Sequence, residues 1–370
     1  MSSLEAIWWR ERPGPAARAL LLPLGVAEWG FRAGAALRGA LYSGGVLRAH
    51  RAGVPVLSIG NLAVGGAGKT PAAIAVARRL AARGRRPAVL SRGYGAARKD
   101  ARVVADRERV RLGASEGGDE PVLIARRLPG VAVLCGPRRV ELARLAVRSL
   151  GCDALLLDDG FQHRALARDL DIVVIDAGNP FGNGHLLPRG PNREPPAALA
   201  RAGLVWLSRA DGAEPARLEA LRALALEATG HGPVESRHAP VDVTDGRLAE
   251  RFGVEALRGR AVALLSGIAR PAAFRRTVEA LGARVVDERR FGDHHRFTDR
   301  ELRGALSGAG AELVVTTEKD AVRLPPDAAA DPRLRVVRIE AELIAGEEIL
   351  ERAIDAALAR FPGPDAAREG

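Results

Sequence analysis

The segment from Ile59 to Pro71 constrains this chain more than any other part of its sequence. It follows an apolar run at 54–59 that predicts a buried strand, and it opens an amphipathic stretch at 70–83 that predicts a helix. Glycines let a backbone curl so that its N–H groups point at phosphate oxygens, and a helix N-terminus adds partial positive charge. The sequence therefore predicts a phosphate-binding loop (P-loop) made of Ala63, Val64, Gly65, Gly66, Ala67, Gly68, Lys69 and Thr70.

Two side chains at the end of this loop carry the chemistry that a P-loop needs. Lys69 can reach the β- and γ-phosphates of a nucleotide, and the Thr70 hydroxyl can ligate Mg²⁺. Ala63 stands where the strict pattern has its first glycine, and Gly65 and Gly66 compensate. The alternative is a glycine-rich turn with a chance Lys-Thr pair. A Rossmann fingerprint fits worse, because no G-x-G-x-x-G can be written here.

The rest of the chain alternates short apolar runs with amphipathic helical stretches. This alternation predicts an α/β fold with a mostly parallel, P-loop kinase-like sheet and helices on both faces. A junction near 231–258 indicates two domains. We expect an N-terminal amphipathic helical region at 1–50, a P-loop nucleotide-binding domain at 51–235, a smaller C-terminal α/β domain at 236–361 that closes over the cleft, and a frayed tail at 362–370.

The N-terminal region has the composition of a helix that lies on a membrane surface. Leu20, Leu24, Ala27 and Phe31 fall at helical spacing, and seven arginines against three glutamates make residues 1–51 basic. The longest uncharged stretch, 19–27, is far shorter than the ~20 apolar residues of a spanning helix. No secretory signal pattern is recognisable. The alternative is a helix that only packs on the domain behind it.

Composition excludes several classes of protein. The two cysteines form no C-x-x-C pair, so neither a disulfide framework nor a zinc ribbon is supported. Lys+Arg exceed Asp+Glu by 56 to 45, and only Lys69, Lys99 and Lys319 are lysines. The net charge of +11 permits an anionic partner. Few aromatic residues and no C₂H₂ spacing argue against a nucleic-acid-binding protein.

An apolar strand at 154–157 ends in two acids, Asp158 and Asp159. This pattern is Walker-B-like, because a carboxylate at the carboxyl end of a buried strand can bind Mg²⁺ directly or through water. A turn-forming Asp-Gly pair is the alternative. The Gln and His that follow favour the functional interpretation.

Two further clusters have ordinary structural explanations. Asp119 and Glu120 precede Pro121, which is typical of a helix start, so the residue types favour capping over a general base and a Mg²⁺ ligand. His294 lies in a Phe-Gly-Asp-His-His segment and could relay a proton if an acid from another element met it. The residues of this segment by themselves favour a solvated polar loop.

Two arginine-bearing loops complete the candidates. Arg92 and Tyr94 follow the second strand, and Arg193 and Glu194 lie in the Gly/Pro-rich segment 181–196. Arginine there can bind phosphate oxygens with both ends of its guanidinium. An exposed connection is the alternative. Lys319, after another predicted strand, is a similar candidate.

Taken in order, these segments resemble the tetraacyldisaccharide 4′-kinases of lipid A biosynthesis over nearly the whole chain. The most specific parts of the resemblance are the P-loop form and the string at 158–163. The resemblance implies a P-loop kinase at the cytoplasmic face of the bacterial inner membrane. It would use ATP and Mg²⁺ to phosphorylate the 4′-hydroxyl of a tetraacyldisaccharide 1-phosphate, with no nucleic acid and no obligate protein partner. A non-kinase P-loop ATPase of membrane assembly, which needs no acceptor base, is the alternative.

The resemblance also implies residue roles. Asp119 would be the base and His294 its orienting partner across the domain cleft. The remaining roles would be phosphate binding by Lys69 and Thr70, metal-side contacts by Thr70, Glu120 and Asp158, a place near the reacting groups for Asp159, and substrate contacts by Arg92, Tyr94, Arg193 and Glu194. Arg189 and Asn192 depart from the family pattern in the 181–196 segment.

Overall fold

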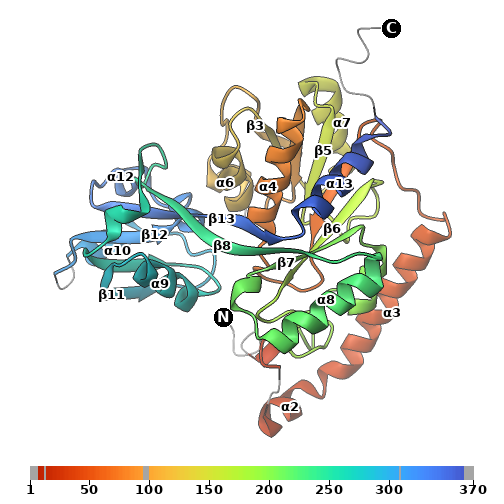
Figure 1. Ribbon diagram of the computed structural model, residues 1–370, viewed down its shortest axis with the longest axis horizontal. Coiled ribbons are helices and arrows are strands. Elements are labelled where there is room, and N and C mark those ends of the chain that lie inside the picture. The colour runs from red at the N-terminus through yellow and green to blue at the C-terminus, as the bar shows by residue number, and fades with distance from the viewer. Residues whose placement is uncertain (1–6, 12–13, 95–99, 308–309, 362–370) are drawn as a thin grey trace.

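The computed structural model describes residues 7–11, 14–94, 100–307 and 310–361. One continuous sheet of thirteen strands joins a larger and a smaller lobe (Figure 1). Its order is β11-β10-β12-β13-β8-β7-β6-β1-β5-β2-β4-β3, with β9 paired to β8. The strands are β1 (Val56–Gly60), β2 (Pro87–Ser91), β3 (Arg102–Ala105), β4 (Ala132–Cys135), β5 (Ala154–Asp158), β6 (Leu170–Asp176), β7 (Leu204–Ser208), β8 (Val234–Thr244), β9 (Arg251–Phe252), β10 (Ala261–Ser266), β11 (Arg284–Arg290), β12 (Leu313–Thr317) and β13 (Leu334–Ala345).

Helices cover both faces of the sheet, which confirms the predicted α/β class (Figure 1). The α-helices are α2 (Pro15–Leu21), α3 (Leu24–Ser43), α4 (Lys69–Ala82), α5 (Ala114–Gly117), α6 (Asp119–Arg127), α7 (Arg139–Leu150), α8 (Pro215–Thr229), α9 (Pro271–Ala280), α10 (Asp299–Leu306), α11 (Glu318–Ala321), α12 (Pro326–Ala329) and α13 (Glu347–Leu358). Three short 3₁₀ helices are η1 (Pro196–Arg201), η2 (Ala210–Gly212) and η3 (Val254–Leu257).

The central strands of the larger lobe are buried on both faces, which explains their unbroken apolar runs. Leu57 and Leu156 face a core that contains α4, whereas Val56 and Leu155 face the core that contains α7. Alternate residues of a strand point to opposite faces, so both sides of each strand have to be apolar. The pairings β6–β1, β1–β5 and β5–β2 are all parallel. The carboxyl ends of β1 and β5 therefore lie at one edge, where the P-loop and the Asp158-Asp159 pair begin.

A long antiparallel ribbon connects the lobes (Figure 1). β8 pairs with β7 of the larger lobe at one end and with β13 along the rest of its length. β13 continues into the smaller lobe by pairing with β12. The expected domain boundary at residue 235 therefore falls inside β8.

The last helix returns to the larger lobe. Leu350 and Ile354 of α13 are buried in the core that contains α4, and Arg79 and Arg83 of α4 pair with acids of α13. The body of the smaller lobe consequently ends with β13. The expected tail at 362–370 lies outside the described residues.

The N-terminal helices α2 and α3 lie along the outside of the larger lobe (Figure 1). Glu28 is buried on the docked side of α3, where its carboxylate accepts a hydrogen bond from the Leu186 backbone N–H at 3.0 Å. Trp29 and Val26, by contrast, are mostly exposed. In the part of the chain that the structure describes, no helix is both long and apolar enough to cross a bilayer.

Candidate active site

The P-loop connects β1 to α4 at the carboxyl edge of the sheet, as the sequence predicts. Gly68 precedes α4 with φ of 91°, a left-handed conformation that favours glycine. A Cβ there would lie 3.0 Å from His238 Nε2 and 3.1 Å from the Ser208 side chain. The first turn of α4 has N–H groups without intrahelical acceptors, so they are available to an anion.

Contacts from neighbouring loops hold the P-loop backbone. The Ser208 hydroxyl donates to the carbonyl oxygen of Ala67 at 2.6 Å, and Arg209 donates to that of Gly66 at 2.7 Å. The Val64 N–H donates to the Pro191 carbonyl at 2.8 Å. A cavity of about 370 Å³ lies along residues 61–67 and is closed on one side by Arg270 of the smaller lobe. A ligand on this loop would therefore contact both lobes.

Asp158 and Asp159 lie beside the P-loop but have opposite electrostatic surroundings. Asp158 is fully buried, and the Ser91 hydroxyl donates to its carboxylate at 3.0 Å. Asp159, with φ of 55°, lies 3.4 Å from Lys69 Nζ and accepts hydrogen bonds from Arg193 at 2.8 and 3.0 Å. Asp158 thus accepts a hydrogen bond from a neutral hydroxyl, whereas Asp159 is in contact with two cations.

The pKa values of the two acids diverge accordingly. Burial, together with the negative charges of Glu120 and Asp159, raises the pKa of Asp158 to about 7 against the pull of Lys69. Burial also acts to raise the pKa of Asp159, but Lys69 and Arg193 outweigh it and hold that pKa at about 2. A pair of adjacent acids with divided pKa values is typical of a functional site.

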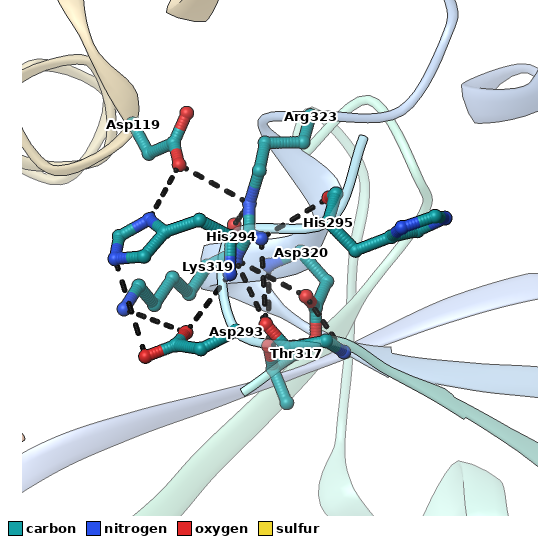
Figure 2. A network of polar contacts seen from close by, with 9 residues as sticks. Asp119, Asp293, His294, His295, Thr317, Lys319, Asp320 and Arg323 are labelled. Atoms are coloured by element: carbon teal, nitrogen blue, oxygen red, sulfur yellow. Dashed lines mark hydrogen bonds and ion pairs between the residues drawn. The ribbon is translucent and has the colours of Figure 1, made fainter. Parts of the chain in front are cut away.

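Asp119 and His294 meet across the two lobes, although 175 positions separate them in the sequence (Figure 2). His294 Nδ1 lies 3.0 Å from Asp119 Oδ2. An ionised carboxylate only accepts hydrogen bonds, so Nδ1 carries the hydrogen and Nε2 faces the other way. His294 has φ of 63°, and such left-handed backbone at a non-glycine residue is frequent at functional sites.

The two ordinary explanations for these residues fail. The N-cap of α6 is Gly118, with no side-chain capping hydrogen bond, and Asp119 is the first helical residue. The helix thus begins two residues before Pro121. His294 is half-buried against Asp119 and Tyr94, with ring centroids of His294 and Tyr94 5.5 Å apart, so it does not belong to a freely solvated loop.

Gly118 explains how Asp119 reaches this position. Its φ is 87°, and a Cβ on it would lie 2.9 Å from the Tyr94 carbonyl oxygen. The 93–94 turn can therefore pass directly over the start of α6 only because residue 118 has no side chain.

Arg323 holds the Asp119 side of this contact and was not predicted (Figure 2). Its Nε lies 3.3 Å from Asp119 Oδ2, and another of its nitrogens lies 3.2 Å from Asp320 Oδ1. Asp320 is fully buried and accepts hydrogen bonds from the Gly267 N–H at 3.1 Å and the Thr317 hydroxyl at 2.8 Å. In the sequence Arg323 is one arginine among many, without a motif of its own.

The predicted substrate residues divide into two groups. Tyr94 is exposed beside His294, Arg92 is exposed two residues before Tyr94, and Arg193 pairs with Asp159. Glu194 is neutralised by Arg201, with contacts at 2.7 and 3.0 Å, which leaves it less free to bind a ligand.

The 181–196 segment docks onto α3. Arg189, one of its departures from the family pattern, lies 3.4 Å from the buried Glu28 carboxylate. His185 Nδ1 lies at the same distance from that carboxylate. The segment is therefore joined to the N-terminal helix, not an isolated exposed connection.

A divalent cation fits the acidic side of the site. Asp158 and Glu120 repel each other, and a cation beside the Thr70 hydroxyl would relieve that repulsion. Among the described residues, no three His, Cys, Asp or Glu side chains gather to bind a metal on their own. Mg²⁺ takes one or two carboxylates and completes its shell with phosphates and water. The predicted metal residues Thr70, Glu120 and Asp158 are a set of this kind.

Comparisons with known proteins identify the family of this chain. The family model described as tetraacyldisaccharide-1-P 4′-kinase matches residues 17–359. A tetraacyldisaccharide 4′-kinase of Anaeromyxobacter sp. (strain Fw109-5) is 72% identical over 362 residues, which cover 97% of this chain and 98% of that one. Another from Syntrophus aciditrophicus is 41% identical over 336 residues, covering 85% and 88%.

A solved structure agrees as well. The crystal structure of LpxK from Aquifex aeolicus in complex with ATP superposes with a TM-score of 0.77 at 28% identity, covering 92% of this chain and 99% of that one. Matches in sequence and in fold thus extend over both lobes and the candidate site. The chain belongs to the tetraacyldisaccharide-1-P 4′-kinase family.

Proposed function

We propose that this chain transfers the γ-phosphoryl group of ATP to the 4′-hydroxyl of a tetraacyldisaccharide 1-phosphate, the precursor of lipid A. Membership of the family supports the reaction, and the Aquifex aeolicus relative was solved with ATP. The observation that carries the proposal is the 3.0 Å contact between Asp119 and His294, beside a P-loop that ends in Lys69. A kinase needs both features, whereas an ATPase without an acceptor hydroxyl needs only the loop.

The P-loop residues 63–70 bind the triphosphate. Main-chain N–H groups of the loop and the first turn of α4 donate to phosphate oxygens, and Lys69 neutralises the β- and γ-phosphates. Lys69 is held by Asp159 before nucleotide arrives. This contact keeps its ammonium group at the mouth of the loop, so little side-chain entropy is lost on binding.

Asp119 removes the proton of the acceptor hydroxyl as that oxygen bonds to the γ-phosphorus. The bond from phosphorus to the β,γ-bridging oxygen breaks, and ADP leaves with its electron pair. His294 donates from Nδ1 to the Asp119 carboxylate and fixes its orientation, and Arg323 Nε lies 3.3 Å from the same oxygen. A sugar hydroxyl is a weak acid, so a base that acts late in the transfer is appropriate.

Thr70, Glu120 and Asp158 are the residues that would hold Mg²⁺. The ion would neutralise charge that develops on the phosphate oxygens during transfer. The pKa of Asp158, raised to about 7, falls when a cation replaces the repulsion from its neighbours. Without the ion, the repulsion between Asp158 and its acidic neighbours is therefore not balanced.

The exposed face of α3 is suited to contact the inner-membrane surface at its cytoplasmic side. Val26, Trp29 and Leu37 of α3, and Leu22 just before this helix, are all more than 60% exposed. Single exposed apolar residues are ordinary, but several on one helix are a signal of an interface. Arginines of the same region would attract anionic headgroups. An acylated acceptor is held in such a surface, so this contact brings enzyme and substrate together.

The test is incubation with γ-labelled ATP, Mg²⁺ and the disaccharide acceptor in detergent micelles. We expect label on the lipid at the 4′ position. Asp119→Asn and His294→Ala should lower kcat by about 10²-fold or more, because general base catalysis contributes about that much, while ATP affinity stays unchanged. Arg303→Ala, in α10 away from the site, is the control. Turnover of ATP without lipid labelling would contradict the proposal.

A further inference from the structure

We infer that the buried ion pair between Arg127 and Glu318 is a positioning joint that aligns Asp119 with His294 across the two lobes. This inference rests on the proposed roles of Asp119 and His294. α6 begins at Asp119 and ends at Arg127, so one nine-residue helix carries the proposed base at its start and this arginine at its end. Both ends of α6 contact the smaller lobe.

The contacts at the end of α6 are numerous and centre on a buried ion pair. One terminal nitrogen of Arg127 donates to both carboxylate oxygens of Glu318, at 2.9 and 2.7 Å, and to the Ile339 carbonyl at 3.1 Å. The other donates to Glu340 at 2.7 Å. The side chains of Arg127 and Glu318 are only 4% and 7% exposed. Solvent therefore screens this pair much less than it screens the pairs at the surface.

Neighbouring charges complete a network at the crossing of the lobes. Arg338 lies 3.4 Å from Glu318 and 3.3 Å from Asp242, and Arg78 lies 2.6 Å from Glu340. The larger lobe contributes two arginines from α4 and α6, and the smaller lobe contributes the acids. Three cations thus face three carboxylates: Arg78, Arg127 and Arg338 against Asp242, Glu318 and Glu340. Burial of the Arg127–Glu318 pair is tolerable only because it is compensated in this way.

The start of α6 is held by the same short segment of the smaller lobe. Glu318 is the first residue of α11, and Arg323 follows that helix by two residues. Arg323 Nε lies 3.3 Å from Asp119 Oδ2, the same oxygen that His294 contacts (Figure 2). Residues 318–323 therefore contact α6 at both of its ends. These two contacts fix the position of α6 along its own axis and its rotation about that axis.

The Arg127–Glu318 pair acts at the end of α6 opposite to the contacts that Arg323 and His294 make with Asp119. The ribbon of β8 and β13 connects the lobes, but two-stranded ribbons twist more freely than wide sheets. A helix of nine residues is rigid over its length of about 13 Å, so a shift at Arg127 is passed on to Asp119. A displacement of about 1 Å between reacting groups can cost about 10²-fold in rate, so the joint acts on kcat.

The experiment compares Arg127→Met in the wild-type background and in a His294→Ala background, with labelled ATP and the micellar acceptor. Melting temperature and the folded fraction are measured for every variant, and ATP affinity by calorimetry. Arg78→Met is the matched control, because Arg78 makes the exposed contact of the same network from α4. If Arg127→Met does not fold, the double variant Arg127→Met, Glu318→Gln is measured in its place, because it removes both charges of the pair.

We expect Arg127→Met to lower kcat by about tenfold or more per folded molecule, with KM for ATP within about twofold and Arg78→Met unchanged. In the His294→Ala background the same substitution should cost less than about twofold, because the alignment it disturbs is already lost. Arg127→Lys, which keeps the charge and one hydrogen bond, should recover part of kcat. An equal loss of kcat in both backgrounds, or an unchanged kcat in Arg127→Met, overturns the inference that the Arg127–Glu318 pair is a positioning joint. An unchanged kcat in His294→Ala alone overturns the catalytic pair itself.

Discussion

Asp158 and Asp159 are adjacent and chemically identical, yet their replacement by asparagine should change stability in opposite directions. Asp158 is buried beside Glu120 and Asp159, whereas Asp159 is paired with Lys69 and Arg193. We expect Asp158→Asn to stabilise the ligand-free protein and Asp159→Asn to destabilise it. Both variants should lose phosphoryl transfer.

The pKa values set the size of each effect. For Asp158 the pKa rises from the ordinary 3.8 to about 7, and about 1.4 kcal/mol per tenfold change makes the ionised form costly by on the order of 4 kcal/mol. For Asp159 the pKa falls to about 2, which amounts to about 2 kcal/mol of stabilisation. In a chain of 370 residues, 1 kcal/mol moves Tm by about 1.3 °C. We expect Asp158→Asn to raise Tm by about 3–5 °C and Asp159→Asn to lower it by about 3 °C.

The pH dependence separates the two cases. A carboxyl whose folded pKa is raised adds stability at low pH and loses it as pH rises through about 7, so the gain from Asp158→Asn should shrink from pH 8 to pH 5. A carboxyl whose folded pKa is lowered keeps its stabilisation until pH falls through about 2, so the loss from Asp159→Asn should be constant over the same range.

The assay is thermal unfolding of both variants and of the wild type between pH 5 and pH 8, without nucleotide or Mg²⁺. Far-UV circular dichroism checks that each variant folds. A fall in Tm for Asp158→Asn at pH 8, as large as that for Asp159→Asn, would refute the electrostatic explanation. A Tm difference for Asp158→Asn that does not vary with pH would refute the raised pKa.

Three other changes have defined outcomes. Glu28→Gln should lower Tm by about 1–3 °C at pH 8, measured by calorimetry. Burial acts to raise the pKa of Glu28, but the Leu186 N–H, His185 and Arg189 together outweigh it and lower that pKa, so the difference should close as pH falls below the ordinary range of glutamate. Trp29→Ser should weaken sedimentation with anionic vesicles several-fold and leave Tm unchanged, since that side chain is 73% exposed. Gly118→Ala should reduce kcat by about tenfold or more in the micellar assay, because a Cβ would meet the Tyr94 carbonyl and φ is 87°.

The parts of the fold that follow from local sequence were predictable. Apolar runs, glycine spacing and the position of the P-loop between β1 and α4 all depend on residues close in the chain. The orientation of α3 was not predictable in this way. The predicted stripe is solvent-exposed at Leu20 and Phe31, because the docked face of the helix carries a buried acid, Glu28, that finds its donors more than 150 residues away. Hydrophobic periodicity indicates that a helix has two faces but does not indicate which face packs.

The residues of the site likewise divide into those whose proximity was predictable from the sequence and those whose proximity was not. The P-loop with Lys69 follows β1, and Asp158 ends β5. These strands are neighbours in a parallel sheet, so the proximity of the two residues follows from topology. The contact between Asp119 and His294 depends on how one lobe sits against the other, and residue spacing carries no information on that. Their local surroundings favoured a cap and a solvated loop, and only the resemblance to a family raised them as a catalytic pair. Arg323 had no sequence signal, because its role arises from burial against Asp119 and Asp320.

The same physical condition recurs on both sides of the cleft: groups that are unfavourable by themselves are held by their surroundings. Asp159 and His294 both have left-handed backbone, which costs about 1–3 kcal/mol each where nothing compensates. Asp159 is fixed by two cations, and His294 by Asp119 from the other lobe. Asp158 accepts a hydrogen bond from Ser91, but burial and the charges of Glu120 and Asp159 outweigh this bond and the pull of Lys69. A cation bound beside Asp158 would relieve the repulsion that its neighbours exert.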